Sequence, residues 1–180
     1  MKLRRILVVL IVLVGVILGA KYVAKQYIFP YNYKDYVDKY SKENNLDPLF
    51  VLSVIKAESD FNPNATSNKK ACGLMQITEE TGKDIAKKMG INNFNTKDLY
   101  NPEINIKMGT WYLKDLYKEF KDWDLVISAY NAGRGNVNKW LEDERYSKDG
   151  VNVTKIPFKE TDSYVEKVNF YYKIYSKLYK

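Results

Sequence analysis

Near its start the chain carries a segment that fits a membrane better than a soluble core. Lys2, Arg4 and Arg5 precede an unbroken apolar run from Ile6 to Ala20, and Lys21 ends the run. A surface helix of a soluble protein keeps one polar face, whereas this run is apolar on every face. A positive flank followed by a hydrophobic segment predicts a membrane anchor or a signal peptide.

The length of the run and its flanking residues separate these two possibilities. A helix that crosses a bilayer needs about 20 residues. The run has fifteen, and Tyr22–Ala24 extend it if the Lys21 amine reaches the membrane interface. A signal-peptide cleavage site needs small residues two positions apart, but the large Leu18 and Tyr22 stand at the first of these positions. We therefore expect an uncleaved anchor.

The distribution of charge divides the chain into an anchor and one domain. Residues 1–29 hold five basic and no acidic residues, which is +5 of the formal net charge of +7. The remaining 24 basic and 22 acidic residues leave residues 30–180 at +2, so no nucleic-acid partner is expected. We expect residues 1–29 to form the anchor and a short stalk, with its positive flank in the cytoplasm. Residues 30–180 would then form one domain outside.

Missing residue types narrow the chemistry that this domain can perform. The chain has no histidine and one cysteine, Cys72. Nucleophilic dyads with histidine, disulfides within the chain and metal sites built from histidine or several cysteines are therefore excluded. Any acid-base chemistry must use Asp, Glu, Lys or Tyr. The sequence predicts neither a metal nor a cofactor.

Helix start and stop signals recur along residues 30–180, and strand patterns are scarce. Asp47-Pro48 and Asn101-Pro102 each place an N-cap residue before a proline, which predicts helices to about Ser59 and to about Phe120. Shorter helices are expected over residues 78–90, 124–132 and 136–141, and a last one from about Thr161. Residues 64–72 are expected to form a loop, and residues 142–156 a loop or a small hairpin. The predicted fold class is mainly α.

The expected last helix carries apolar and aromatic residues at helical spacing. They share one face: Tyr164, Val168, Tyr171, Tyr172, Tyr175 and Leu178. Such a stripe could stack against sugars, but packing against the core is the favoured interpretation.

One carboxylate stands where the core pattern should continue. Val51, Val54 and Ile55 mark the buried face of the helix that begins at Pro48, and the next position on this face is Glu58. Partial burial there would raise the pKa of Glu58 and keep a proton available near neutral pH, as a general acid requires. The alternative is that the helix frays and Glu58 turns to water.

Several short blocks around Glu58 and later in the chain follow one another in a specific order. They are Glu58-Ser59-Asp60-Phe61-Asn62-Pro63-Asn64-Ala65, Ser67, Gly73-Leu74-Met75-Gln76-Ile77, Ala129-Tyr130-Asn131-Ala132-Gly133, Ile156-Pro157-Phe158, Glu160-Thr161 and Tyr164-Val165. In this order and spacing the chain resembles the catalytic domain of the soluble-lytic-transglycosylase (SLT) family, lysozyme-like proteins related to goose-type lysozyme. The resemblance covers residues 34–178.

The resemblance implies a peptidoglycan lytic transglycosylase with a lysozyme-like fold. Such enzymes cleave the β-1,4 bond between N-acetylmuramic acid (MurNAc) and N-acetylglucosamine (GlcNAc) and leave 1,6-anhydromuramyl ends. Glu58 would be the single catalytic acid and base. A muramidase of the same fold stays open, with Asp60, Asp84 or Glu160 activating water, and so does a non-catalytic wall-binding module.

The resemblance also implies a set of substrate-binding residues: Ser67, Gln76, Tyr130, Asn131, Glu160 and Tyr164. Each has a structural alternative, such as a turn or cap bond for Ser67 and Gln76, or a place in the core for the tyrosines. Tyr130 would bond Glu58 or the substrate. The chain departs from the family where Thr78-Glu79 replaces a usual Met-Pro, and where Cys72 replaces a small residue.

Partners and location follow from the anchor and the resemblance together. The expected partners are peptidoglycan strands and, through the N-terminal helix, the cell membrane. We expect a single-pass protein with a cytoplasmic N-terminus and the domain facing the cell wall. A partner in a wall, secretion or conjugation machinery would be compatible with this location, but the sequence does not identify one.

Overall fold

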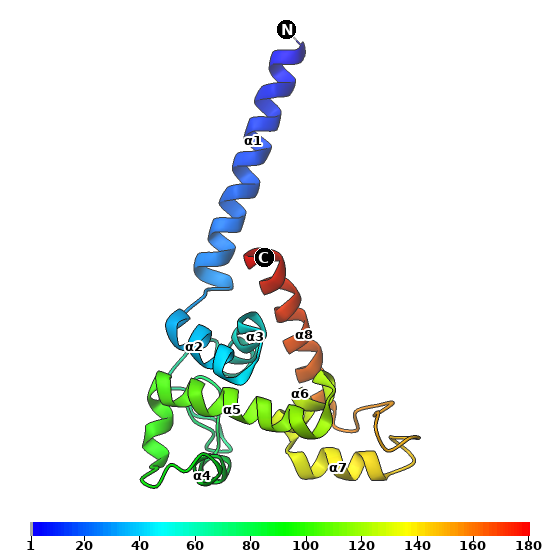
Figure 1. Ribbon diagram of the computed structural model, residues 1–180. Coiled ribbons are helices and arrows are strands. Elements are labelled where there is room, and N and C mark those ends of the chain that lie inside the picture. Colours follow the sequence, from blue (N-terminus) through cyan, green and yellow to red (C-terminus); the bar gives the residue numbers. More distant parts are fainter. Residues whose placement is uncertain (1) are drawn as a thin grey trace.

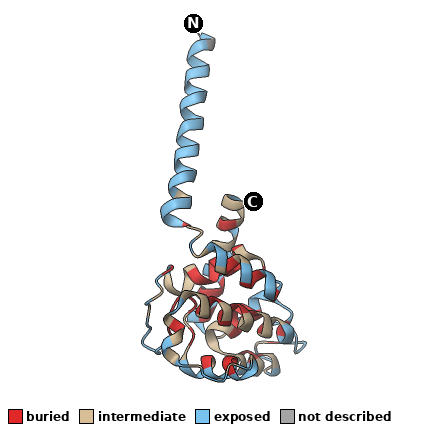
Figure 2. Ribbon diagram, turned by 60° about the vertical axis from the view of Figure 1, so that its left-hand side comes forward, coloured by how far each residue is buried: buried red, intermediate tan, exposed pale blue. Residues whose placement is uncertain are grey.

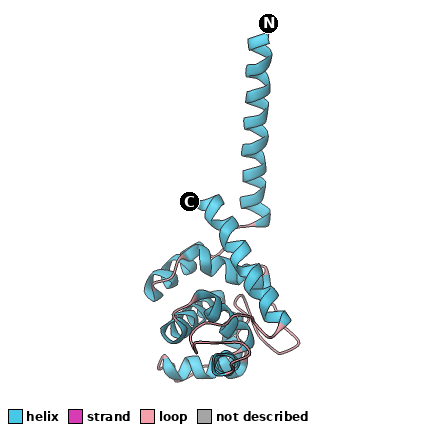
Figure 3. Ribbon diagram, turned by 90° about the vertical axis from the view of Figure 1, so that its right-hand side faces the viewer, coloured by secondary structure: helices cyan, strands magenta, loops and turns pink. Residues whose placement is uncertain are grey.

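The chain folds almost entirely into helices. The computed structural model describes residues 2–180 (Figure 1). Within these residues, β-pairing is limited to the isolated bridges Thr66–Cys72 and Cys72–Ile77, and Figure 3 shows no strand. The elements in chain order are α1 Lys2–Val23, a π-helix Ala24–Ile28, α2 Lys34–Asn44, α3 Pro48–Ser59, α4 Glu79–Lys88, a 3₁₀-helix Thr96–Tyr100, α5 Pro102–Phe120, α6 Trp123–Ala132, α7 Arg134–Glu142 and α8 Lys159–Tyr179. The predicted mainly α class is confirmed.

The helix starts lie where capping residues predicted them. The Asp47 carboxylate accepts a hydrogen bond from the Leu49 backbone N–H at 2.8 Å, and the Asn101 side chain does the same for Glu103 at 2.9 Å. The hairpin alternative for residues 142–156 is wrong. Residues 143–158 form turns and loop between α7 and α8.

Helix α1 stands away from the rest of the molecule (Figure 2). The segment Arg4–Ile28, which joins most of α1 to the π-helix, contains an 18-residue window with a mean hydropathy of 2.8, and none of that window is buried. The segment is therefore long and apolar enough to cross a membrane. The end of the expected stalk is not free of the domain. Phe29 is buried, and its ring packs edge-on against Tyr171 and Tyr175 at centroid distances of 5.7 and 5.4 Å.

The core is built around α3. Every residue from Leu49 to Ile55 is buried, because α3 packs against both α2 and α8. Helix α5 packs against α2 and α6, and α6 also contacts α8. Figure 1 shows α8 running from this core back toward the base of α1, and its Tyr179 hydroxyl bonds the carbonyls of Lys25 and Phe29.

The apolar residues of α5 and the stripe predicted for α8 face this core. On α5, Met108 and Leu116 are fully buried, while Ile104 and Trp111 pack at its edge. On α8, three of the six stripe residues are buried and the other three pack against them: Tyr164, Val168 and Tyr175, then Tyr171, Tyr172 and Leu178. The core interpretation of the α8 stripe is confirmed.

Candidate active site

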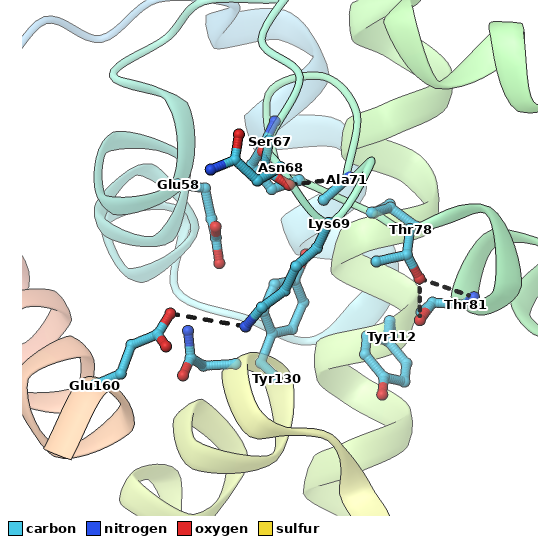
Figure 4. Close-up of a pocket in the computed structure, with 13 residues that line it drawn as sticks. Glu58, Ser67, Asn68, Lys69, Ala71, Thr78, Thr81, Tyr112, Tyr130 and Glu160 are labelled. Atoms are coloured by element: carbon cyan, nitrogen blue, oxygen red, sulfur yellow. Dashed lines mark hydrogen bonds and ion pairs between the residues drawn. The ribbon is translucent and has the colours of Figure 1, made fainter. Parts of the chain in front are cut away.

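A cleft of about 360 Å³ brings together most of the predicted site residues (Figure 4). Its walls come from the end of α3, the loop between α3 and α4, helices α4 to α6 and the first turn of α8. The lining residues are Glu58, Ser67, Asn68, Lys69, Ala71, Gln76, Ile77, Thr78, Thr81, Tyr112, Tyr130, Asn131 and Glu160. Of the predicted site residues, Tyr164 alone is outside this lining, and its hydroxyl bonds the Glu58 carboxylate.

A second hollow continues the cleft past Glu58. It has a volume of about 490 Å³ and is lined in part by Lys56, Lys167 and Tyr171. Glu58 and two neighbours, Ser67 and Gln76, line both hollows. A groove therefore extends to both sides of Glu58, as a polymeric ligand would require.

Helix α3 holds Glu58 one turn beyond its buried stretch. The helix continues to Ser59, and Asp60 ends it in a left-handed conformation with φ 49°. The Tyr164 hydroxyl, from α8, donates a hydrogen bond to Glu58 Oε1 at 2.5 Å. The alternative in which the helix frays and Glu58 turns to water is therefore wrong.

Burial gives the Glu58 carboxyl an unusual pKa. Desolvation raises its pKa from the ordinary 4.5 to about 7, although the Tyr164 hydrogen bond and the charge of Lys167 act in the opposite direction. The increase that periodicity predicted is confirmed. Burial first, and the Glu58 charge second, raise the pKa of Tyr130 and Tyr164 well above the ordinary value, so both phenols are neutral donors.

The two tyrosines have different partners from those the sequence suggested. Tyr130 donates its hydroxyl to the Met75 carbonyl at 2.7 Å, so it fixes the loop between α3 and α4 rather than the Glu58 carboxylate. The expected bond from Tyr130 to Glu58 is wrong in this structure. Tyr164, which also fits the core stripe of α8, takes that position.

A buried amide shapes the loop that carries the cleft residues. Asn105, on α5, accepts from the Met75 N–H at 2.7 Å and donates to the carbonyls of Leu99 and Cys72 at 2.7 and 3.0 Å. Gly73 packs against this amide with φ +76°, and a Cβ there would lie 2.1 Å from the Leu99 carbonyl oxygen. Gly73 therefore permits a close approach to the protein's own backbone. Sequence reasoning missed Asn105, a polar residue between two isoleucines on a core helix.

Ser67 and Gln76 support the same loop. The Ser67 hydroxyl accepts from the Ala71 N–H at 3.1 Å. The Gln76 amide nitrogen donates to the carbonyls of Ala65 and Gly73 at 3.1 and 2.9 Å. Both side chains thus make the turn or cap bonds that were the structural alternative to substrate binding. The Ser67 hydroxyl proton and the Gln76 amide oxygen have no hydrogen-bond partner within residues 2–180, and both residues line the groove.

The remaining predicted residues, Asn131 and Glu160, lie at the end of α6 and at the start of α8. Asn131 accepts a hydrogen bond from the Thr161 hydroxyl at 2.8 Å, which braces α8 against the end of α6. Glu160 is exposed at the cleft mouth, and its carboxylate lies 3.8 Å from the Lys69 ammonium (Figure 4). Sequence reasoning missed Lys69 and Tyr112 as cleft residues. Only the position of Lys69 two residues after Ser67 could have indicated it.

Of the other carboxylates considered for a water-activating role, Asp60 lines the second hollow, and Asp84 lies outside both hollows. Asp60 is exposed and pairs with Lys56 at 2.7 Å, and Asp84 pairs with Lys88 on α4 at 2.8 Å. Within the described residues, the carboxylates that line the 360 Å³ cleft are Glu58 and Glu160.

Known proteins share the domain but are much longer. Residues 35–152 match the model of the Transglycosylase SLT domain family. The soluble lytic murein transglycosylase of Salmonella typhimurium is 36% identical over 146 residues, which cover 79% of this chain and 23% of the relative. Membrane-bound lytic murein transglycosylase C of Actinobacillus pleuropneumoniae is 33% identical over 159 residues, covering 76% and 44%.

Solved structures agree with these matches. An inactive mutant of lytic transglycosylase Slt from Pseudomonas aeruginosa has a TM-score of 0.72 and 30% identity, covering 86% of this chain and 26% of that one. The 70-kDa soluble lytic transglycosylase of Escherichia coli has the same TM-score and identity, covering 83% and 25%. The chain thus spans about a quarter of these proteins. Its sequence and fold place it in the Transglycosylase SLT domain family.

Proposed function

We propose that this protein is a lytic transglycosylase that cleaves the MurNAc-β-1,4-GlcNAc bond of peptidoglycan. The names of its relatives, lytic murein transglycosylases, support the reaction class. The observation that carries the proposal is the position of Glu58 in the middle of a groove that extends to both sides of it, together with its pKa of about 7. A carboxyl near half-protonation at neutral pH can both give and take a proton.

The proposed reaction uses Glu58 twice. Glu58 first protonates the glycosidic oxygen, and the bond from that oxygen to the muramyl C1 breaks. The Glu58 carboxylate then accepts the proton of the muramyl 6-hydroxyl, while the oxygen of that hydroxyl bonds to C1. This step yields a 1,6-anhydro end and restores the protonated Glu58. Because the sugar's own hydroxyl replaces water, one carboxylate suffices where most glycosidases use two.

The other cleft residues hold Glu58 and the strand. Tyr164 fixes Oε1 of Glu58, and within residues 2–180 no group hydrogen-bonds Oε2, which is the oxygen we assign to proton transfer. Ser67 and Gln76 offer their unused groups to sugar hydroxyls or acetamido groups. Tyr130 and Asn131 hold the cleft walls through Met75 and Thr161, and Glu160 meets the strand at the mouth.

The experiment that tests this function is product analysis of digested peptidoglycan by mass spectrometry. The full-length chain should release anhydromuramyl products, and Glu58→Gln should release none while keeping its helical circular-dichroism spectrum. Glu43→Gln, an equal change on the exposed face of α2, is the control and should retain activity. Reducing muramic acid ends would instead identify a muramidase. Absence of products from the wild-type chain would leave a wall-binding module.

We also propose that α1 anchors the protein in the cell membrane, with its N-terminus in the cytoplasm and residues 30–180 facing the wall. The apolar helix and a relative named as membrane-bound support this location. The full-length protein should stay with membranes after a carbonate wash. A shortened soluble form that begins near residue 21 or 25 would show a cleaved signal instead.

A further inference from the structure

Lys69 crosses the mouth of the cleft. Its side chain extends from the loop after α3 toward α8, where its ammonium lies 3.8 Å from the Glu160 carboxylate (Figure 4). Among the described residues that line the cleft, Lys69 is the only cation. It is therefore the one side chain there that could bind an anionic group by charge.

The pairing of Lys69 with Glu160 is easily exchanged. The two side chains are 78% and 76% exposed, and ion pairs this open to water stabilise little. Because the partners come from opposite walls, they must separate or swing aside when a strand enters. A carboxylate on the strand could then replace Glu160 as the partner of Lys69 without leaving a buried charge unpaired.

The proposed substrate carries such carboxylates. Every second sugar of a peptidoglycan strand is a muramic acid, whose lactyl group ends either in a free carboxylate or in a stem peptide with carboxylates of its own. The strand is therefore anionic near any bond that is cut. Glu58 and Glu160 in the cleft would repel it whenever they are ionised, and Lys69 offsets this repulsion.

We propose that Lys69 binds a carboxylate of the peptidoglycan strand and makes the cleft prefer strands with free carboxylates over neutralised ones. The inference rests on the proposed function, and it names a binding residue that lies outside the blocks shared with the family. Lys69 acts on affinity and selectivity. The proton transfers remain with Glu58.

Strand binding by the full-length chain in detergent tests this inference without requiring turnover. The Glu58→Gln chain serves as the parent, so that bound strands stay intact, and Lys69→Met is added to keep the side-chain length without the charge. Lys70→Met is the matched control, because it removes a charge from the same loop outside the cleft lining. The strands are either stem-bearing or freed of stems, each with its carboxylates intact or converted to methylamides.

We expect Lys69→Met to raise the Kd for carboxylate-bearing strands about tenfold, the loss expected for one charge-assisted hydrogen bond. Methylamidated strands should bind both chains equally, and Lys70→Met should match the parent. An effect confined to stem-free strands identifies the lactyl carboxylate, and an effect confined to stem-bearing strands identifies the peptide. Equal Kd values for all strands, or equal losses on intact and amidated strands, would overturn the proposal. Product analysis of the wild-type chain judges the proposed function separately.

Discussion

The Tyr164 hydroxyl donates a hydrogen bond of 2.5 Å to the Glu58 carboxylate, although the two residues lie 106 positions apart in the chain. The bond joins the last turn of α3 to the first half of α8. It stabilises the ionised form of Glu58 and therefore opposes the increase in pKa that burial causes. Position and acidity of the proposed catalytic group thus depend on one phenol.

Replacing Tyr164 with Phe should shift the pH dependence of cleavage. The Tyr164 hydrogen bond lowers the pKa of Glu58, and burial raises it. Loss of the bond should therefore raise the pKa of Glu58 further. The protonated acid then persists to higher pH, and the alkaline limb of kcat/KM should move upward. We expect kcat to fall about tenfold, because the carboxyl is less firmly positioned. Tyr172→Phe, which removes a bond to Asp47 from the same helix, is the control. An unmoved alkaline limb in Tyr164→Phe would contradict this role.

The burial of Glu58 should make the folded protein less stable at alkaline pH. Its pKa is about 7 in the folded chain and near 4.5 when exposed, so the folded state holds the proton between these values. The stabilisation is fully present below about pH 4.5 and is lost as pH rises through 7, a difference of about 3 kcal/mol at most. Glu58→Gln does not titrate. Denaturation in one detergent should therefore show the variant gaining stability over wild type from pH 4 to pH 8, and a constant difference would refute the assignment.

Two glycines with similar backbone angles should respond differently to alanine. Gly73 and Gly90 have φ of +76° and +72°, so both substitutions incur the strain of a left-handed residue, about 1 kcal/mol. At Gly90 no heavy atom of residues 2–180, apart from those of the glycine and its two chain neighbours, lies within 4 Å of the added Cβ, whereas at Gly73 the Leu99 carbonyl oxygen lies at 2.1 Å. Gly73→Ala should therefore lose about 1–3 kcal/mol more in the free energy of unfolding. Equal losses would show that the loop relaxes freely.

The contact between α8 and the segment that follows α1 should be measurable by hydrogen exchange. Tyr179 donates its hydroxyl to the carbonyls of Phe29 and Lys25 at 2.8 and 3.3 Å. Tyr179→Phe removes this bond, which at about 1 kcal/mol should speed exchange of the Phe29 amide about fivefold. Tyr27→Phe is the control, because Tyr27 is 74% exposed. Unchanged exchange in Tyr179→Phe would mean that ring packing alone holds the segment.

Local signals predicted the parts of the fold that depend on neighbouring residues. Asp47 and Asn101 mark the starts of α3 and α5 because an N-cap acts within its own first turn. Helix α2 had no such signal. Its N-cap position is Tyr33 in a left-handed conformation, without a side-chain cap among the described residues, and packing against α5 holds it in place.

Contacts between distant segments could not be read in the same way. Periodicity placed Glu58 on a buried face, but it could not say which of two tyrosines would reach it, and the expected partner Tyr130 bonds Met75 instead. The cleft position of Lys69 depends on the path of a loop whose shape is set by Asn105, 36 residues further along. Such positions are decided by tertiary packing rather than by local pattern.

Helix α8 sets the distance between the cleft and the segment that leads out of α1. Tyr164 near one end meets the proposed catalytic carboxyl, and Tyr179 at the other end holds the segment that leads out of α1. Fifteen residues of α-helix separate these two contacts by about 22 Å. With α1 across the membrane as proposed, the cleft would sit at a fixed height above the lipid surface. Only glycan in the innermost layer of the wall would then come within its reach.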